Sequence, residues 1–415
     1  MADPLYAAVS GLNADQTFMS VVSQNIANVD TVGYKSGAVS FAEALQQTTQ
    51  GATAPTATIG GTNPIQETAG GAVNVSAIQV NMGQGTLQST GVNTDLAIQG
   101  NGFFLEQTPQ GLAYTRAGNF SLDANGALVD PTGNLVMGWT GGSAQTKASL
   151  VPLTIPLNGS IAPAATSTGT LTGNLSASGT TLSLPLTLYN SLGAQESTTL
   201  NFSSTPTAGS TPIYFNSSGT PVAAATGTGS TWYVSANGTD TAGAVAPLTV
   251  TANGSTITLS GFPAAWNMPG NVSLNYTQMT QFDAPSTLEA SANGNASGTL
   301  SSYNFNNAGQ IVGTYSNGQT QVLGQVALAG FNNPAGLTNI GNNLWQASAN
   351  SGTSQVGVPN TGQLGSVASG QLEESNVNLD GEFVNLIVAQ QGYEANAKVV
   401  TVDQTLAQTL TNAVQ

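Results

Sequence analysis

Residues 24–35 read QNIANVDTVGYK, and in this stretch a helical pattern gives way to turn residues. Before it, apolar residues recur at intervals of seven and predict a helix of about 25 residues that ends near Asn28. This stripe consists of Leu5, Val9, Leu12, Met19, Val22 and Ile26. After it, Asn, Asp, Thr and Gly favour turns, because their side chains or small size satisfy irregular backbone. The stretch therefore marks the end of an N-terminal helix.

A second apolar stripe with the same spacing lies at the C-terminus. It consists of Leu379, Phe383, Leu386, Tyr393, Ala397, Val400, Leu406 and Leu410, the last two slightly out of register. We interpret the adjacent Glu373 and Glu374 as charges at the start of this helix, where its dipole favours them. Neither stripe has a partner nearby in the sequence. We expect the terminal helices to pair as a coiled coil, with each other and with neighbouring copies; the alternative is two ordinary core helices.

Between the two ends the pattern is that of β-strands. Apolar and polar residues alternate between Gly, Asn-Gly and Asp-Pro turn signals from position 95 to 139. We predict a mainly β fold with paired terminal coiled-coil helices and two discontinuous or inserted β domains. The predicted parts are 1–30 with 372–415 as the helical domain, 31–75 with 353–371 as an extended connector, 76–140 with 285–352 as an inner β domain, and 141–284 as an inserted outer β domain. The low complexity of the insertion leaves disorder as an alternative.

Charge and composition limit the partners. The 415 residues include 4 basic and 19 acidic residues, which gives a net charge of −15. Without a basic cluster, binding to nucleic acid or to an anionic membrane is not expected, because both need Lys or Arg to meet phosphate. The chain has no cysteine and no histidine. Disulfides, thiolate or imidazole metal sites, and Ser-His-Asp or Cys-His catalysis are therefore excluded.

The remaining polar residues do not form a recognisable catalytic or cofactor site. Asp95, Asp123 and Asp130 stand beside Gly and Asn turn residues, where Asp is common for backbone reasons. Gly100 and Gly102 lack the third glycine and the following helix of a dinucleotide loop. We expect no catalytic activity, no cofactor and no metal. A polysaccharide hydrolase that uses paired carboxylates is the enzymatic alternative.

The N-terminus lacks the basic and apolar regions of a secretory signal peptide. No window holds the roughly 20 apolar residues of a membrane-spanning helix. We expect no membrane insertion, and, for a protein that acts outside the cell, export without a cleaved signal.

Three motifs resemble the bacterial flagellar axial proteins, the rod and hook family. The residues that match the N-terminal signature are Asn25, Ile26, Ala27, Asn28, Asp30, Thr31, Gly33, Tyr34 and Lys35. LEESNVNLDGEFVNLIVAQQGYEANAKVV at 372–400 resembles the C-terminal signature, and DLAIQGNGFF at 95–104 with YTRAGNFSLDANGALVDPTG at 114–133 resembles the shared β module. The long insertion and residues 321–352 are similar to the hook branch of the family.

The resemblance implies a structural subunit of the flagellar hook, a curved tubular universal joint that transmits torque from rod to filament. Family members are exported unfolded by the type III apparatus, and then polymerise with copies of themselves. They contact the rod, the hook cap and the hook-filament junction proteins. The connector residues Asn25, Asn28, Thr31, Gly33, Tyr34 and Lys35 would contact adjacent subunits, with Lys35 either paired to a neighbour's carboxylate or solvated. The alternatives are a distal rod protein of the same family and a β-rich surface adhesin.

Overall fold

The computed structural model describes residues 4–43, 46–50, 65–68, 73–141, 145–223, 229–239 and 245–413. The chain divides into two compact units. Unit 1 comprises Met1–Ile155, Asn304–Val312 and Val322–Gln415, and unit 2 comprises Pro156–Tyr303 and Gly313–Gln321. The predicted fold class, mainly β with α-helices at the two ends, is confirmed.

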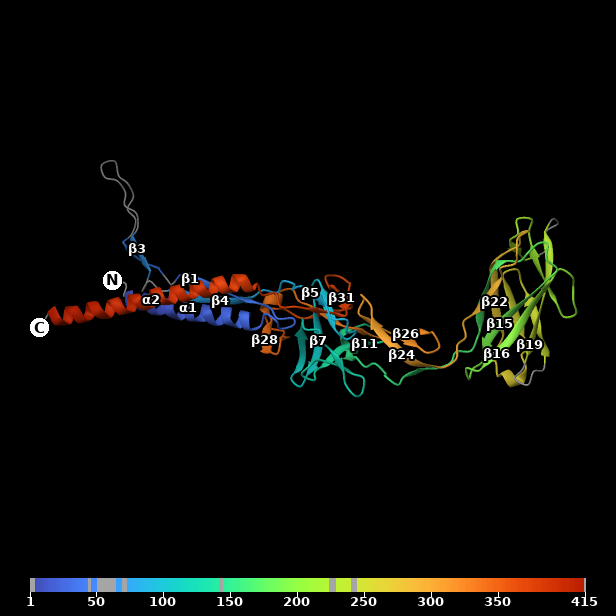
Figure 1. The fold of residues 1–415 in the computed structure, drawn as a ribbon, viewed down its shortest axis with the longest axis horizontal. Coiled ribbons are helices and arrows are strands. Elements are labelled where there is room, and N and C mark those ends of the chain that lie inside the picture. The colour runs from blue at the N-terminus through green and yellow to red at the C-terminus, as the bar shows by residue number, and fades with distance from the viewer. Residues whose placement is uncertain are drawn as a thin grey trace, which may run out of the picture. The chain divides into compact units, whose positions relative to one another are not determined.

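The two helices of unit 1 are α1 (Pro4–Ala27) and α2 (Leu379–Ala413). They lie side by side, blue and red in Figure 1, and they run antiparallel, because Asn25 contacts Glu382 whereas Asp15 contacts Asn396. The predicted C-terminal stripe begins at Leu379, where α2 begins, but the predicted position of Glu373 at the start of a helix is wrong. Residues 371–373 form strand β32 (Gln371–Glu373), and Asn378 caps the helix by accepting the Gly381 N–H at 3.1 Å.

The connector after α1 contains a two-stranded antiparallel ladder. Strand β1 (Gly37–Glu43) pairs with β4 (Val73–Val80), and Phe41 packs edge-on against Phe18 of α1 with ring centroids 5.9 Å apart. Strands β2 (Gln46–Gln50) and β3 (Ile65–Thr68) pair with each other. The rest of the predicted connector between 44 and 72 lies outside the described residues.

The β module of unit 1 is built around neighbouring strands in the order β26-β11-β7-β8-β29-β28. Its aromatic core includes Phe103, Tyr114 and Trp139, and Phe331 meets the first two edge-on. The strands are β5 (Leu87–Ser89), β6 (Leu96–Gln99), β7 (Phe103–Thr108), β8 (Gly111–Thr115), β9 (Ser121–Leu122), β10 (Leu128–Val129), β11 (Leu135–Thr140), β12 (Val151–Pro152), β26 (Thr320–Val326), β27 (Leu328–Gly330), β28 (Thr338–Gly341), β29 (Leu344–Gln346), β30 (Gln355–Gly357) and β31 (Ser366–Ser369).

Unit 2 is a β structure with its own core. Its main sheet has the order β15-β16-β19-β20-β21-β22-β14-β23, in which β14 and β22 are parallel and the other neighbours are antiparallel. Trp232, Trp266 and Phe202 are buried in the core. The strands are β13 (Ser160–Ile161), β14 (Thr168–Asn174), β15 (Thr181–Tyr189), β16 (Gln195–Ser203), β17 (Thr211–Phe215), β18 (Pro221–Val222), β19 (Ser230–Thr239), β20 (Val245–Ala252), β21 (Thr256–Ser260), β22 (Val272–Thr280) and β23 (Glu289–Ala292). The boundary between the units falls within β24 (Gly298–Phe305), β25 (Gln310–Tyr315) and β26.

The predicted domain limits differ from these units. Residues 151–152 of the predicted insertion pair with β11 in unit 1, while β23, predicted in the inner domain, pairs with β14 in unit 2. Residues 353–371 are not a connector, because β30 pairs with β27 and β31 pairs with β6. These strands have three or four residues, too few to show an alternating pattern against a Ser-, Gly- and Asn-rich background.

Candidate functional site

Small and polar residues meet where α1 and α2 approach closely. Asn396 Nδ2 donates a hydrogen bond to Asp15 Oδ2 at 2.9 Å. A Cβ added at Gly11 would lie 2.5 Å from Asn396 Nδ2, and one at Gly392 would lie 3.0 Å from the Asp15 carboxylate oxygens. The glycines therefore allow the close approach of the helices at these polar contacts, and Ala389 is buried between them.

Only part of the predicted apolar stripes is buried in the single chain. Val22 is buried, and Leu5, Leu12, Met19, Ile26, Leu386, Ala397 and Val400 are half-buried. Five predicted positions are more than a third exposed: Val9, Leu379, Phe383, Tyr393 and Leu406. The side chain of Leu410 lies outside the described residues. A stripe of large apolar residues predicts amphipathic helices, but it does not identify the face at which small residues permit close contact.

A second stripe on α2 was not identified from the sequence. It consists of Val384, Val388, Ala395, Val399, Val402 and Leu406, spaced by three, four or seven residues, and all six are exposed. This spacing places the six side chains along one face of the helix, as in a coiled-coil seam. Leu406, out of register with the predicted stripe, is in register with this one.

The motif residues in the last turn of α1 and just after it contact the helix pair. Asn25 is buried; its Oδ1 accepts the Gly37 N–H at 2.9 Å, and its Nδ2 donates to the Gly37 carbonyl and to Glu382 Oε1. Tyr34 donates its hydroxyl to Asn25 Oδ1 at 3.3 Å. Burial, and then the Glu382 carboxylate, raise the pKa of Tyr34. Asn25 thus joins α1, β1 and α2.

Two further motif residues shape the turn. Asn28 Oδ1 accepts the Thr31 hydroxyl at 3.1 Å, and its Nδ2 caps the carbonyl of Gln24. Gly33 has a φ of 69°, and a Cβ there would lie 2.5 Å from the backbone nitrogen of Ala117. The Gly33 N–H donates to the Glu373 carbonyl at 2.7 Å. The turn therefore touches the β module directly, which explains why glycine occupies this position.

Lys35, Glu373 and Arg116 form a buried ion cluster. Lys35 Nζ lies 2.5 Å from Glu373 Oε1, and Arg116 Nη1 lies 3.2 Å from Glu373 Oε2. The Lys35 and Glu373 side chains are both 0% exposed. The carbonyls of Gly83 and Gly100 accept from Lys35 and Arg116, and the Gly85 N–H donates to Glu373. Burial lowers the pKa of Lys35 and of Arg116, and Glu373 opposes both shifts.

This cluster corrects two sequence predictions. Lys35 is neither solvated nor free for a neighbour's carboxylate, because a carboxylate 338 positions away in the same chain meets it. Glu373 is not a helix-start charge but the shared anion of two cations. The pairing is non-local, so no sequence spacing could reveal it. The one sequence feature that singled out Lys35 and Arg116 was the rarity of Lys and Arg, with four in the whole chain.

Glu106 and Asp130 line a pocket in unit 1, with a volume of about 430 Å³. Glu106 is 1% exposed, and its Oε2 has no hydrogen-bond partner among the described residues. Asp130 accepts from the backbone N–H groups of Thr132 and Asn134, so it is held as a turn-forming carboxylate. Burial, and then the charge of Asp130, raise the pKa of Glu106 to about 8. The folded chain therefore favours the protonated, uncharged form of Glu106.

The described part of the chain contains no group of three or more acidic side chains placed to hold a metal ion. None of its helices is long and apolar enough to span a membrane. Within the described residues, the candidate functional features are therefore the exposed apolar stripe of α2 and the buried polar contacts described above.

Comparisons with known proteins identify the class of such a chain. Residues 5–35 match the family model described as flagella basal body rod protein, 97–172 match the flagellar hook protein FlgE/F/G D1 domain, and 368–413 match the flagellar basal body rod FlgEFG protein C-terminal. Paired terminal helices and a β module with these matches define a flagellar axial protein.

Relatives that match over nearly their whole length identify the branch of this family. The chain is 33% identical to the flagellar hook protein FlgE of Borreliella burgdorferi, with 99% of each chain covered. It is 34% identical to the flagellar hook protein FlgE of Salmonella typhimurium, with 98% of each covered. The crystal structure of Helicobacter pylori flagellar hook protein FlgE2 aligns with a TM-score of 0.46 and 16% identity, over 69% of this chain and 100% of that chain. The chain belongs to the flagellar hook protein FlgE family.

Proposed function

We propose that the chain is the structural subunit of a bacterial flagellar hook and polymerises with copies of itself. The observation that carries this proposal is the second stripe of α2. Six exposed apolar side chains in register form a surface that a single chain leaves in water, and such patches mark interaction sites. A helix of a neighbouring copy would cover this seam.

The predicted seam residues fit the same role. The five exposed positions Val9, Leu379, Phe383, Tyr393 and Leu406 are available to neighbouring copies, whereas the half-buried ones are already partly covered within one chain. Contacts of unlike surfaces that do not close into a ring generate a helical tube. The terminal helices would then form a continuous wall of that tube.

The connector would give each subunit a fixed internal joint. Asn25 and the Lys35–Glu373–Arg116 cluster fasten the helix pair to the β module by buried polar contacts. Torque needs such stiffness within a subunit, while bending needs contacts between subunits that change register. A surface with few ion pairs suits the second requirement, because small polar groups lose little when contacts slide.

The family also suggests where the polymer acts. We infer a place in the flagellum between rod and filament, outside the cell, with the rod, the hook cap and the hook-filament junction proteins as neighbours. Export would use the type III apparatus without a cleaved signal. The role is structural, and no catalytic activity is proposed.

Labelling with antibody locates the protein. Antibody against unit 2 residues 156–303 would be applied to whole cells, isolated flagella and stripped basal bodies, with detection by immunogold electron microscopy. Label confined to a short segment at the filament base supports the hook subunit. Label on stripped basal bodies alone would place the protein in the rod, and diffuse label over the cell would favour an adhesin. Cells that lack the gene are the control.

A further inference from the structure

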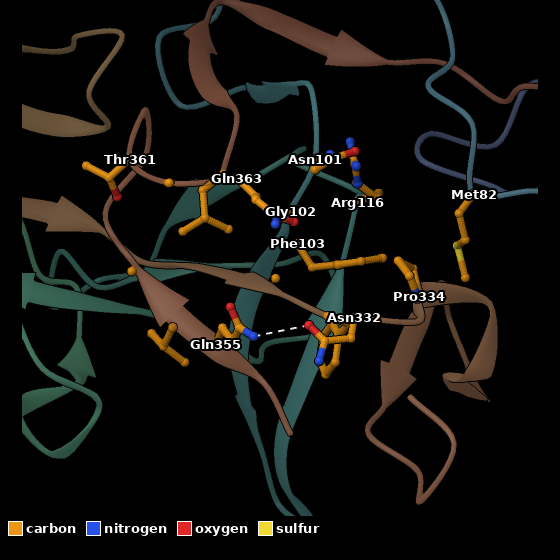
Figure 2. A pocket seen from close by; sticks show the side chains of 16 residues that line it. Met82, Asn101, Gly102, Phe103, Arg116, Asn332, Pro334, Gln355, Thr361 and Gln363 are labelled. Atoms are coloured by element: carbon orange, nitrogen blue, oxygen red, sulfur yellow. Dashed lines mark hydrogen bonds between the residues drawn. The ribbon is translucent and has the colours of Figure 1, made fainter. Parts of the chain in front are cut away.

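A pocket of about 430 Å³ lies beside the ion cluster of unit 1. Its walls come from residues 101–103, 330–332, 355–357 and 361–364, together with Met82, Arg116 and Pro334. Figure 2 shows Asn101 and Arg116 next to each other in the wall, with Phe103 near the guanidinium and Gln355 hydrogen-bonded to Asn332. The pocket therefore brings amide side chains and one cation together.

Arg116 has donors to spare. Of its five N–H groups, one donates to Glu373 at 3.2 Å and another to the Gly100 carbonyl at 2.9 Å. Its Nε has no acceptor among the described residues, although Arg116 is only 4% exposed. The ring of Phe103 lies 5.3 Å from the guanidinium carbon and occupies one face of the group. The Nε atom is itself sealed from solvent, so a ligand in the pocket would act on the guanidinium through its positive charge and the small exposed part of its side chain.

The charges of the cluster do not balance. Lys35 and Arg116 carry two positive charges, and Glu373 is the one carboxylate that forms an ion pair with either of them in the described part of the chain. One positive charge is thus in excess in a buried region of a chain whose net charge is −15. An uncompensated buried charge is strongly unfavourable, and a second carboxylate in the pocket would neutralise it.

We propose that this pocket receives a carboxylate-bearing loop from a second copy of the chain. The proposal rests on the proposed function, because a copy is the partner that polymerisation brings into contact. A copy also supplies the chemistry, since 19 of its residues are acidic. A guanidinium binds a carboxylate through paired, charge-assisted hydrogen bonds. The pocket volume exceeds that of one carboxylate and suits a loop tip.

Arg116 is the sole arginine of the chain, so its Nε–H gives a single resonance in the full-length protein labelled with ¹⁵N-arginine. Acetate serves as the carboxylate probe, with chloride at equal ionic strength as the control. We expect acetate to shift the resonance and chloride to leave it in place. We also expect Gln363→Trp, which adds bulk at an exposed pocket residue, to abolish the acetate response. Equal responses to acetate and chloride would overturn the proposal.

Polymerisation tests the identity of the occupant. Gln363→Trp should reduce the rate of polymer growth from purified monomer by about tenfold or more, whereas Gln363→Ala should grow like wild type. Thermal unfolding of both monomers should match wild type, because Gln363 is exposed. Wild-type growth by Gln363→Trp would overturn the pocket proposal and leave the proposed function intact. Failure of the wild-type chain to polymerise would instead contradict the proposed function.

Discussion

Asp15 of α1 and Asn396 of α2 are joined by a 2.9 Å hydrogen bond, and a glycine of the opposite helix faces each of them. Gly11 lies against Asn396, and Gly392 lies against Asp15. The two polar side chains thus occupy the space that two Cβ atoms would need. This reciprocal arrangement fixes one antiparallel register, because sliding either helix would place a side chain against a side chain.

A double-mutant cycle on Asp15 and Asn396 should give a coupling energy of about 1 kcal/mol, the usual size for one hydrogen bond. Asp15→Ala, Asn396→Ala and the double variant would be compared by denaturant unfolding. The cycle cancels the differences in helix propensity between the residues. Asp15→Ala combined with Gln404→Ala, an exposed α2 position, is the control and should show no coupling. A coupling near zero for the first pair would contradict the structure.

Gly33→Ala should destabilise the protein more than Gly91→Ala. Both glycines have φ near 70°, where a Cβ costs about 1 kcal/mol. At Gly33 the added carbon would also lie 2.5 Å from the Ala117 nitrogen, whereas at Gly91 it would meet nothing within 4 Å. Thermal unfolding of the two variants isolates the steric part of the cost. Equal losses would mean that the turn can move away from the β module.

Removing the Glu373 carboxylate, the shared anion of the ion cluster, should greatly lower the free energy of unfolding. Glu373→Gln leaves Lys35 and Arg116 buried without a counter-charge, and such losses cost about 3–5 kcal/mol. Glu394→Gln is the matched charge change, because Glu394 is exposed on α2 and loses the same negative charge. Its effect should stay within about 0.5 kcal/mol. Denaturant unfolding of both variants measures the difference, and similar stabilities would argue against a buried cluster.

The sequence predicted well those features that depend on local pattern. The N-terminal helix ends at Ala27, one residue before the expected Asn28, because turn-forming Asn, Asp, Thr and Gly follow it. The β class followed from alternation between turn signals. The sequence wrongly places Glu373 at the start of α2, because acidic residues suit a helix start. Glu373 instead lies in β32, which pairs with β5, nearly 300 positions away.

The candidate site was less predictable, because its contacts are between distant residues. Lys35 meets Glu373, and Asp15 meets Asn396, through a fold that no spacing in the sequence encodes. From the sequence, Gly392 predicts only a lower helix propensity. The close approach of Asp15 that this glycine allows depends on the opposite helix, so the sequence does not reveal it. The subunit-interface role of the apolar stripes stays a prediction.

Serine substitutions on the second stripe should block polymer growth without unfolding the monomer. Val388 and Val399 are 55% and 43% exposed, so Val388→Ser with Val399→Ser should change monomer stability by about 0.5 kcal/mol or less per site. Loss of apolar contact with a neighbour should raise the critical concentration for polymerisation, measured by sedimentation. Gln390→Ser with Thr401→Ser, on the opposite side of α2, is the control. Equal critical concentrations for both double variants would exclude this seam from the polymer contact.

Glu106 should make the fold less stable as pH rises. Its pKa is raised from 4.5 to about 8 in the folded chain, so between these values the folded state holds a proton that the unfolded state releases. The stabilisation is complete below pH 4.5 and is lost as pH rises towards 8, with a slope of at most ~1.4 kcal/mol per pH unit. The chain has no histidine, which keeps the middle of this range free of imidazole titration.

Glu106→Gln tests this linkage, because glutamine mimics the protonated carboxyl at every pH. Denaturant unfolding from pH 5.5 to 7.5 should show a falling free energy for wild type and a flatter profile for the variant. Glu394→Gln, at an exposed position of α2, should keep the wild-type slope. If Glu106→Gln and Glu394→Gln gave the same pH profile, Glu106 could not be the group that holds the proton retained by the folded state. A flatter profile for Glu106→Gln alone would locate that proton beside Asp130.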